Sequence, residues 1–395
     1  MKSPEHTVDR RLLTSCIIGF FCFFGSYMRL PIVPLLATSL GADAVQVGMI
    51  NGVFMLTACC LSIPSGLVSD RFGRRLPLLG GLLLLAGSSF VLYWSSSLPQ
   101  LALIYLLFGV GLSTFSPALM AYVGDVTPPE FRGQAFGWYT MAMYCGMTLG
   151  PAAGGFVANS LGLRPVFPLA GGLILAMFFV VLFFLPTSAA ARRSSVSHHA
   201  VLESLKSLMG NRQLLACLVA VFGCCLGYGT FVTFMPLYML SLGMNTVHVG
   251  LVFAAGALVN ALSRLPSGHL CDRFKDRSIL VVSGLAVFAI AVASFGLCHS
   301  AFSFIVAAAV MGGGMGVAFT VICALIADAV PQEKRGLAVG CYNTCIYAGM
   351  MLSSAGMGPV IRAEGFRVAF VSNGVVAVLA LGLFRWIYQH RSVSD

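Results

Sequence analysis

The chain has 395 residues, of which 58% are hydrophobic and 9% are charged, and its formal net charge is +10. A soluble domain carries about a quarter charged residues, and no soluble core can absorb this much apolar surface, so the composition excludes the soluble enzyme classes. The positive charge would suit a nucleic-acid partner on a soluble chain, but here it lies between apolar segments, which excludes that partner as well. We therefore predict an all-α membrane protein.

Twelve apolar segments follow one another along the chain. A bilayer is crossed by about 20 apolar residues in a helix, which satisfies its own backbone hydrogen bonds. The first segment superficially resembles a signal peptide, but its apolar run is too long and Pro31 and Pro34 follow, so we predict an uncleaved first span. We expect twelve transmembrane helices at 12–38, 46–69, 77–96, 99–124, 133–158, 164–186, 212–240, 247–271, 278–298, 301–328, 335–361 and 367–389.

The basic residues predict the orientation in the membrane. Eighteen of the 23 Lys and Arg fall on the side that holds both termini, three fall on the other side, and Arg29 and Arg264 lie within spans. Because Lys and Arg accumulate on the cytoplasmic side, we expect a multi-pass protein of the inner (plasma) membrane. Both termini are then cytoplasmic.

A charged loop separates the second segment from the third, and it occurs twice. It reads GLVSDRFGRR at Gly66–Arg75 and returns 202 residues later as GHLCDRFKDR at Gly268–Arg277. Val47-Gly48 and Val249-Gly250 match at the same offset, so the chain is a duplicated six-helix unit. We predict an N-terminal bundle at 1–186, a cytoplasmic linker at 187–211 and a C-terminal bundle at 212–395.

The pattern G-x-x-x-D-R-x-G-R-R between helices two and three resembles the signature loop of the major facilitator superfamily. The resemblance implies two pseudo-symmetric six-helix bundles and transport by alternating access, with Asp70 and Arg71 as a latch that closes the cytoplasmic side. A topology anchor is the alternative, and the second copy is the weaker latch because it has Lys275 and Asp276 in place of Gly73 and Arg74. The predicted gating residues are Asp70, Arg71, Gly73, Arg74, Arg75, Glu130, Arg132, Asp272 and Arg273.

The fifth segment carries GMTLGPAAGG, which resembles the helix-five motif of the twelve-helix drug:proton antiporters and implies export. Glycines four residues apart let another helix approach closely, and a proline bends the span, so plain helix packing is the alternative. The motif residues are Gly146, Gly150, Pro151, Gly154 and Gly155. Helix four departs from this family, because Tyr105 stands where an Arg is usual and Phe108 where a Gln is usual.

The coupling ion stays open at this point. The family implies protons, but none of the 13 Asp and Glu lies deep in a span, where a carboxylate could carry a proton. The charged residues within the spans are Arg29 and Arg264, which could capture a carboxylate or phosphate, so an organic-anion exchanger or uniporter is the alternative function. Alternatively, both arginines could have a structural role, in which they bond to neighbouring groups of the protein rather than to a substrate. A non-transporting membrane sensor is a third class.

Polar and aromatic groups on the helices that line the cavity in this family are the candidate substrate ligands. They are Tyr27, Arg29, Asn51, Tyr105, Tyr139, Tyr228, Asn260, Arg264, Tyr342 and Asn343. The 13 cysteines are scattered without a C-x-x-C pair or histidines at zinc-ligand spacing, so we expect neither a metal nor an organic cofactor. The expected partners are a small-molecule substrate, the lipid bilayer and, by resemblance, protons, and we expect a monomer.

Overall fold

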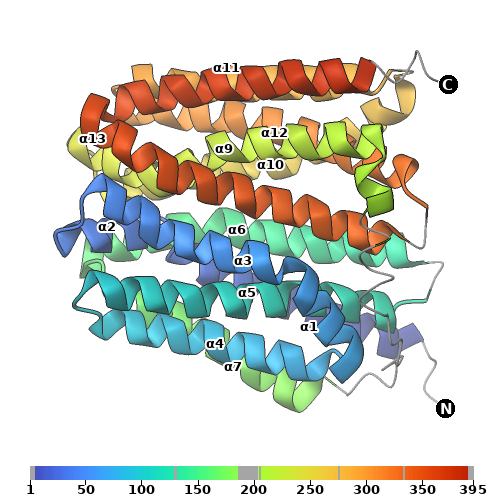
Figure 1. The fold of residues 1–395 in the computed structure, drawn as a ribbon. Coiled ribbons are helices and arrows are strands. Elements are labelled where there is room, and N and C mark those ends of the chain that lie inside the picture. The colour runs from blue at the N-terminus through green and yellow to red at the C-terminus, as the bar shows by residue number, and fades with distance from the viewer. Residues whose placement is uncertain are drawn as a thin grey trace. The chain divides into compact units, whose positions relative to one another are not determined.

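A computed structural model describes residues 5–128, 131–185, 203, 206–274, 276–331 and 334–389. Throughout these residues the regular structure is helical (Figure 1). The helices are α1 (Glu5–Met28), α2 (Ile32–Ser39), α3 (Ala44–Phe72), α4 (Arg75–Trp94), α5 (Leu98–Val126), α6 (Arg132–Leu161), α7 (Val166–Phe184), α9 (Arg212–Ser241), α10 (Thr246–Arg273), α11 (Ser278–Ser294), η2 (Phe295–Leu297), α12 (Ala301–Ala329) and α13 (Arg335–Gln389).

The prediction of an all-α membrane protein is confirmed, and each of the twelve predicted segments is helical. Ten helices of the described chain are long and apolar enough to span a membrane. One of these ten is α13, which has 55 residues and is divided by the non-helical backbone of Gly365 (φ 83°). The remaining segment is α6, a helix of 30 residues. Large apolar side chains such as Phe183 (72% exposed) and Ile290 (68% exposed) face outward, as lipid contact requires.

The first span is broken near its middle. α1 ends at Met28 and α2 begins at Ile32. Pro31 lacks an amide hydrogen and disfavours helical backbone at the residue before it, so the helix cannot continue through this point. The carbonyl oxygen of Arg29 accepts hydrogen bonds from the amides of Ile32 (3.0 Å) and Val33 (3.1 Å). The break therefore places Arg29 where one helical segment ends and the next begins.

The chain forms two compact units. Unit 1 comprises Met1–Gly41, Cys60–Ser194 and Asn245–Ala254, and unit 2 comprises Ala42–Cys59, Ser195–Met244 and Ala255–Asp395. α3 and α10, which are counterparts in the sequence repeat, each contribute residues to both units. The other helices each lie within one unit.

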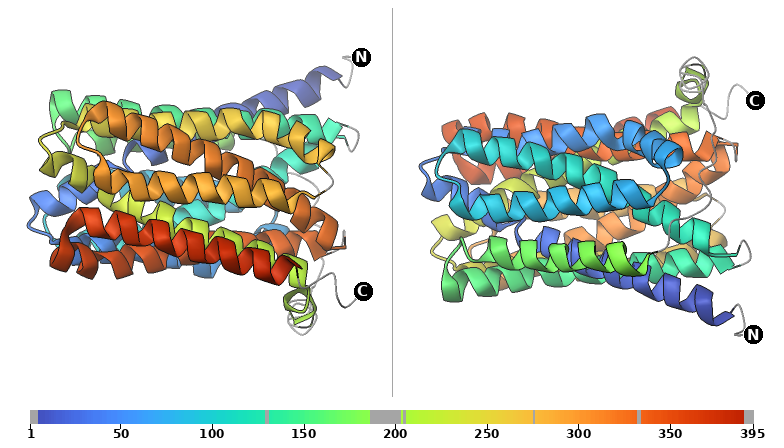
Figure 2. Two further views of the ribbon diagram at one scale, coloured as in Figure 1. Left: turned by 90° about the horizontal axis from the view of Figure 1, so that it is seen from above. Right: turned by 90° about the horizontal axis from the view of Figure 1, so that it is seen from below.

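The two units repeat the same packing scheme. In unit 1, α1 packs against α6 and α7, and α4 packs against α5 and α7 (Figures 1 and 2). In unit 2, α9 packs against α13, and α11 packs against α12 and α13. The 202-residue offset relates α1 to α9 and α4 to α11, so each unit uses equivalent helices for equivalent contacts. This agreement confirms the pseudo-symmetry that the duplicated sequence predicts.

Candidate functional site

In unit 1, the loop between α3 and α4 is tied to two neighbouring helices. Gly73 adopts a positive φ of 80°, which lets the chain turn between α3 and α4 at little conformational cost. The Nε atom of Arg74 lies 2.9 Å from the Asp125 carboxylate at the end of α5. Arg75 donates from Nη2 to the carbonyl oxygen of Leu182 in the last turn of α7, at 2.6 Å.

In unit 2, the equivalent loop is tied to the equivalent helices with different chemistry. Arg277 pairs with Asp328 at the end of α12, with Nη1 and Oδ2 2.5 Å apart. Asp276 lies 3.6 Å from Nη1 of Arg385 in the last turns of α13. The loop in unit 2 therefore supplies a base to α12 and an acid to α13, whereas the loop in unit 1 supplies a base to both α5 and α7.

Asp276 is held in its ionised form. Its Oδ1 atom accepts hydrogen bonds from the hydroxyl of Ser278 at 2.6 Å and from the Ser278 amide at 3.0 Å. The Ser278 hydroxyl is the largest of several contacts that lower the pKa of Asp276, and Arg385 adds to the effect. Asp276 therefore carries a negative charge at neutral pH.

Several predicted gating residues lie outside what the structure describes. Glu130 is outside the described residues, and so are the side chains of Asp70, Arg71 and Asp272. Arg132 and Arg273 are exposed, at the start of α6 and the end of α10. The latch role of the loop accordingly stays a prediction, while Gly73, Arg74 and Arg75 have the structural roles given above.

The helix-five motif lies on α6 and places three of its glycines against α1. A Cβ atom at Gly150 would lie 2.6 Å from the carbonyl oxygen of Phe24, closer than van der Waals contact allows. Gly146 and Gly154 stand one turn to either side, and a Cβ atom there would overlap the backbone carbonyls of Phe20 and Met28. The three glycines therefore let the backbones of α1 and α6 touch along two helical turns.

The rest of the motif faces the segment of α10 that belongs to unit 1. A Cβ atom at Gly155 would overlap the carbonyl oxygen of Thr246, and one at Gly250 would lie 2.6 Å from the carbonyl oxygen of Pro151. Thr246 donates from its hydroxyl to the carbonyl oxygen of Gly155 at 2.9 Å. The motif thus has two contact faces, one for α1 and one for α10.

Arg29 is completely buried (0% exposed) among helices of unit 1. Its Nη1 atom donates to the hydroxyls of Ser89 (2.8 Å) and Ser88 (3.3 Å) on α4. The guanidinium carbon lies 3.5 Å from the ring centroid of Phe108 and 5.9 Å from that of Tyr105, both on α5. Tyr105 and Phe108 stand where the antiporters usually have an Arg and a Gln. These two aromatic rings therefore surround the guanidinium of Arg29.

The other candidate substrate residues are divided between the units. Tyr27 and Tyr139 lie in unit 1, whereas Asn51, Tyr228, Asn260, Arg264, Tyr342 and Asn343 lie in unit 2. The structure joins Arg264 to Asn260, whose Oδ1 accepts from Arg264 Nε at 3.1 Å. Asn51, Tyr139 and Asn260 are buried and the others of these eight are half-buried. The structure does not bring the ten candidates together as one pocket within either unit.

A buried polar network in unit 2 was missed by the sequence analysis. Asn373 donates to the Thr230 hydroxyl at 2.7 Å, and this hydroxyl lies 2.6 Å from that of Ser353. A second hydroxyl pair, Thr233 and Ser354, lies 2.7 Å apart. The sequence did carry a signal for such networks, namely short polar side chains within long apolar segments. The Ser88-Ser89 pair is another example.

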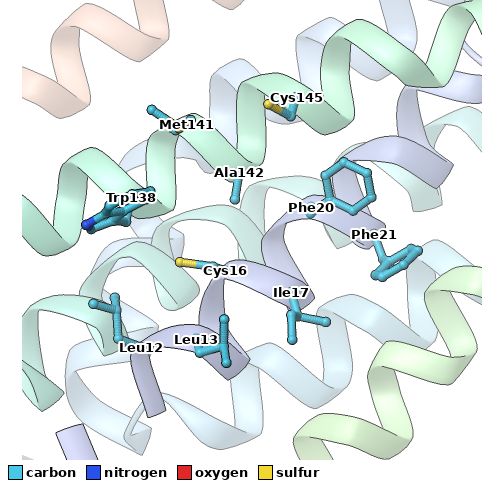
Figure 3. A pocket seen from close by; sticks show the side chains of 10 residues that line it. All are labelled: Leu12, Leu13, Cys16, Ile17, Phe20, Phe21, Trp138, Met141, Ala142 and Cys145. Atoms are coloured by element: carbon cyan, nitrogen blue, oxygen red, sulfur yellow. The ribbon is translucent and has the colours of Figure 1, made fainter. Parts of the chain in front are cut away.

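An apolar cleft of about 440 Å³ lies between α1 and α6 in unit 1 (Figure 3). Side chains from both helices line it, with Trp138 at one end and Phe21 at the other. None of its ten described lining residues is charged. It can accept hydrocarbon, and it does not offer the polar groups that would orient a substrate.

The described carboxylates bear on the coupling ion. Those of Asp43, Asp125, Asp276, Asp328, Glu203 and Glu364 are exposed or half-buried, so no carboxylate in the described part of the chain is buried within a span. The described residues also hold no group of three His, Cys, Asp or Glu side chains suited to a metal ion.

The sequence is similar to known membrane carriers along most of its length. The family model of the Major Facilitator Superfamily matches residues 15–300 and 247–394. The multidrug resistance protein MdtG of Citrobacter koseri is 27% identical over 396 residues, which cover 97% of this chain and 95% of that protein. The staphylopine export protein of Staphylococcus aureus is 23% identical over 354 residues, which cover 88% and 89%.

Solved structures share the fold. A bacterial homolog of the human lysosomal transporter Spinster superposes with a TM-score of 0.79 at 16% identity, covering 97% of each chain. A D-xylose-proton symporter superposes with a TM-score of 0.79 at 17% identity, covering 94% of this chain and 96% of that one. At these identities the likeness establishes the arrangement of the helices and leaves the substrate open.

Proposed function

Because the chain belongs to the major facilitator superfamily, we propose that it is a secondary transporter that exports a small organic molecule by alternating access. The membership itself makes it a multi-pass membrane transporter rather than an enzyme. Export is supported by two relatives that match most of the chain, one named as a staphylopine export protein and the other as a multidrug resistance protein.

The observation that carries the proposal is the packing of the helix-five motif in unit 1. By sequence, Thr246 and Gly250 belong to the second half of the duplicated chain, but they pack against Gly155 and Pro151 of the first half. A carrier that rocks its halves must form and break such contacts reversibly. The glycines let the backbones of α6 and α10 approach closely enough to exclude a solute. One hydroxyl hydrogen bond joins the two helices there, so few specific bonds must break when the contact opens.

The proposed inner gate is the loop at Gly66–Arg75. We assign to Asp70 and Arg71 the latch that opens during transport, and to Arg74 and Arg75 the braces that hold the loop to α5 and α7. The braces keep the end of α3 fixed to its own unit, so the latch can act on a rigid support. Transport at the wild-type rate by Asp70→Asn would remove this assignment.

The two bundles, the orientation and the assembly state belong to the same proposal. We propose bundles at 1–186 and 212–395 joined by a linker at 187–211, in the inner (plasma) membrane with both termini cytoplasmic. The basic residues support the orientation, since 18 of 23 fall on the side of the termini. The transporter is proposed to act as a monomer.

A carrier for organic anions is the second candidate function. Of the two intramembrane arginines, Arg264 bonds to Asn260 of its own helix at 3.1 Å, which supports a structural role. Arg29 has no acidic partner among the described residues of its unit. This favours an anionic substrate, whether the protein imports or exports it.

Proteoliposomes that contain the purified protein test the export proposal. An imposed pH gradient should drive the probe ethidium into inside-out vesicles, in which the cytoplasmic side of the protein faces the medium, and collapsing the gradient should release it. Equal ethidium uptake by protein-free vesicles would refute drug-type export. Uptake that persists without any pH gradient would exclude protons as the coupling ion, an outcome consistent with the scarcity of buried carboxylates.

A further inference from the structure

Arg29 presents an unused hydrogen-bonding edge inside unit 1. Its Nε and Nη2 atoms are buried and have no hydrogen-bond partner in the described part of the chain. These two nitrogens form one side of the guanidinium fork, the side that binds both oxygens of a carboxylate through parallel hydrogen bonds. The third nitrogen, Nη1, is occupied by Ser88 and Ser89.

The surroundings hold this edge in a fixed orientation. Ser88 and Ser89 each donate to the carbonyl oxygen of Leu85, at 2.9 and 2.8 Å, which aims their acceptor lone pairs at Arg29. The ring of Phe108 lies 3.5 Å from the guanidinium carbon and covers one face of its plane. With Nη1 bonded and one face stacked, the guanidinium needs little reorientation for its unpaired Nε–Nη2 edge to bind a ligand.

Among the side chains of unit 1 that the structure describes, no carboxylate lies at this edge. Asp9 stands in the first turns of α1, 20 residues before Arg29, about 30 Å at 1.5 Å per residue. Asp125 lies 17 residues from Phe108 along α5, about 25 Å, and it pairs with Arg74. In the sequence, Asp70 stands four residues before Arg74 and Glu130 five residues after Asp125. A charge buried without a counter-ion is costly, so the partner must come from outside unit 1.

We propose that Arg29 binds the carboxylate of the transported molecule, through Nε and Nη2, at the break between α1 and α2. This inference rests on the transport function proposed above and names its substrate class, an organic acid with an apolar or aromatic body beside Phe108 and Tyr105. Discontinuous membrane helices build substrate sites in other carriers. Arg29 is closed off here, so the ligand enters when the carrier changes conformation.

A thermal-shift comparison of two isosteric probes tests the site. Benzoate and benzamide have the same shape, but only benzoate carries the charge. Benzoate should raise the unfolding temperature of the purified protein in proportion to the logarithm of its concentration, and benzamide should not. Equal stabilisation by both probes, or by neither, would overturn the proposal. Phenylphosphonate measured beside them distinguishes a carboxylate site from a general oxyanion site, and a stronger response to it than to benzoate would overturn the assignment.

Substitutions at Arg29 separate an anion site from a structural brace. Arg29→Met removes the unpaired charge, so the ligand-free variant should unfold at the wild-type temperature or higher and should no longer respond to benzoate. Arg29→Lys keeps the charge without the fork, and its benzoate affinity should fall by about tenfold or more, equivalent to about 1.4 kcal/mol. A brace would instead give a destabilised Arg29→Met protein that still responds to benzoate.

A matched control uses another arginine of unit 1. Arg164→Met removes the same charge from a side chain that donates to the carbonyl oxygen of Tyr93 at 2.5 Å, and its response to benzoate should equal that of the wild type.

The transport proposal and the carboxylate-site proposal can be refuted independently. Ethidium transport without benzoate binding would refute only the carboxylate site, and benzoate binding by a protein that transports neither ethidium nor benzoate would refute only the transport proposal.

Discussion

Replacing Gly150 by alanine should separate α1 from α6 and destabilise the protein. The added Cβ would lie 2.6 Å from the carbonyl oxygen of Phe24 and 3.0 Å from the amide nitrogen of Met28. Both neighbours are backbone atoms, so the two helices must move apart by about 0.8 Å to reach ordinary contact at 3.4 Å. Overpacking of this kind costs about 1–3 kcal/mol, and the gain of alanine over glycine in a helix offsets about 0.5–1 kcal/mol.

Gly137 provides the matched control on the same helix. It is exposed, and no atom lies within 4 Å of a Cβ built there, so Gly137→Ala should show the propensity gain alone. The difference between the two variants in the free energy of unfolding should then equal the overpacking cost of about 1–3 kcal/mol. The assay is reversible unfolding by sodium dodecyl sulfate in mixed bicelles, followed by circular dichroism. Gly150→Ala at or above the stability of Gly137→Ala would refute the argument for close backbone contact.

The loop braces give further predictions. A double-mutant cycle on Arg74 and Asp125, whose side chains are 15% and 23% exposed, should give a coupling of about 1 kcal/mol, and a coupling of zero would mean that the pair does not hold the loop. Asp276 has a lowered pKa in the folded protein, so its stabilising contribution is complete above about pH 4 and is lost as the pH falls through the folded pKa. Asp276→Asn should therefore flatten the acid side of the stability–pH profile, and an unchanged profile would contradict the role of Ser278 and Arg385. Ser278→Ala should shift the native Asp276 titration, followed by NMR, to higher pH.

The fold could be predicted because it depends on features that can be recognised locally in the sequence. Apolar length determines that a segment spans the membrane, and the repeated loop at Gly66–Arg75 and Gly268–Arg277 reveals the duplication. Which glycines face which helix could not be read in the same way. Gly150 and Gly155 look alike in sequence, but one meets α1 and the other meets α10, because that choice depends on tertiary packing.

The candidate site was only partly accessible from sequence. A charge within an apolar run singles out Arg29, and its burial agrees with that interpretation. Its contacts with Ser88 and Phe108 join residues 59 and 79 positions apart in the chain, and no local pattern encodes such pairs. The repeat also failed to predict the braces, because Arg74 corresponds to Asp276 in the second copy and the bridging arginine there is Arg277.

The sharing of α3 and α10 between the units has a consequence for how the polypeptide can be divided. A cut in the linker at 187–211 would leave Ala42–Cys59 on one fragment and the unit that they complete on the other, and the reverse holds for Asn245–Ala254. Neither fragment could bury its own contact surfaces alone, so each should be degraded when expressed singly. Co-expression should rescue both by complementation, since each fragment supplies the helical turns that the other lacks. The two gene halves are thus obligate partners, although each encodes a recognisable copy of one ancestral unit.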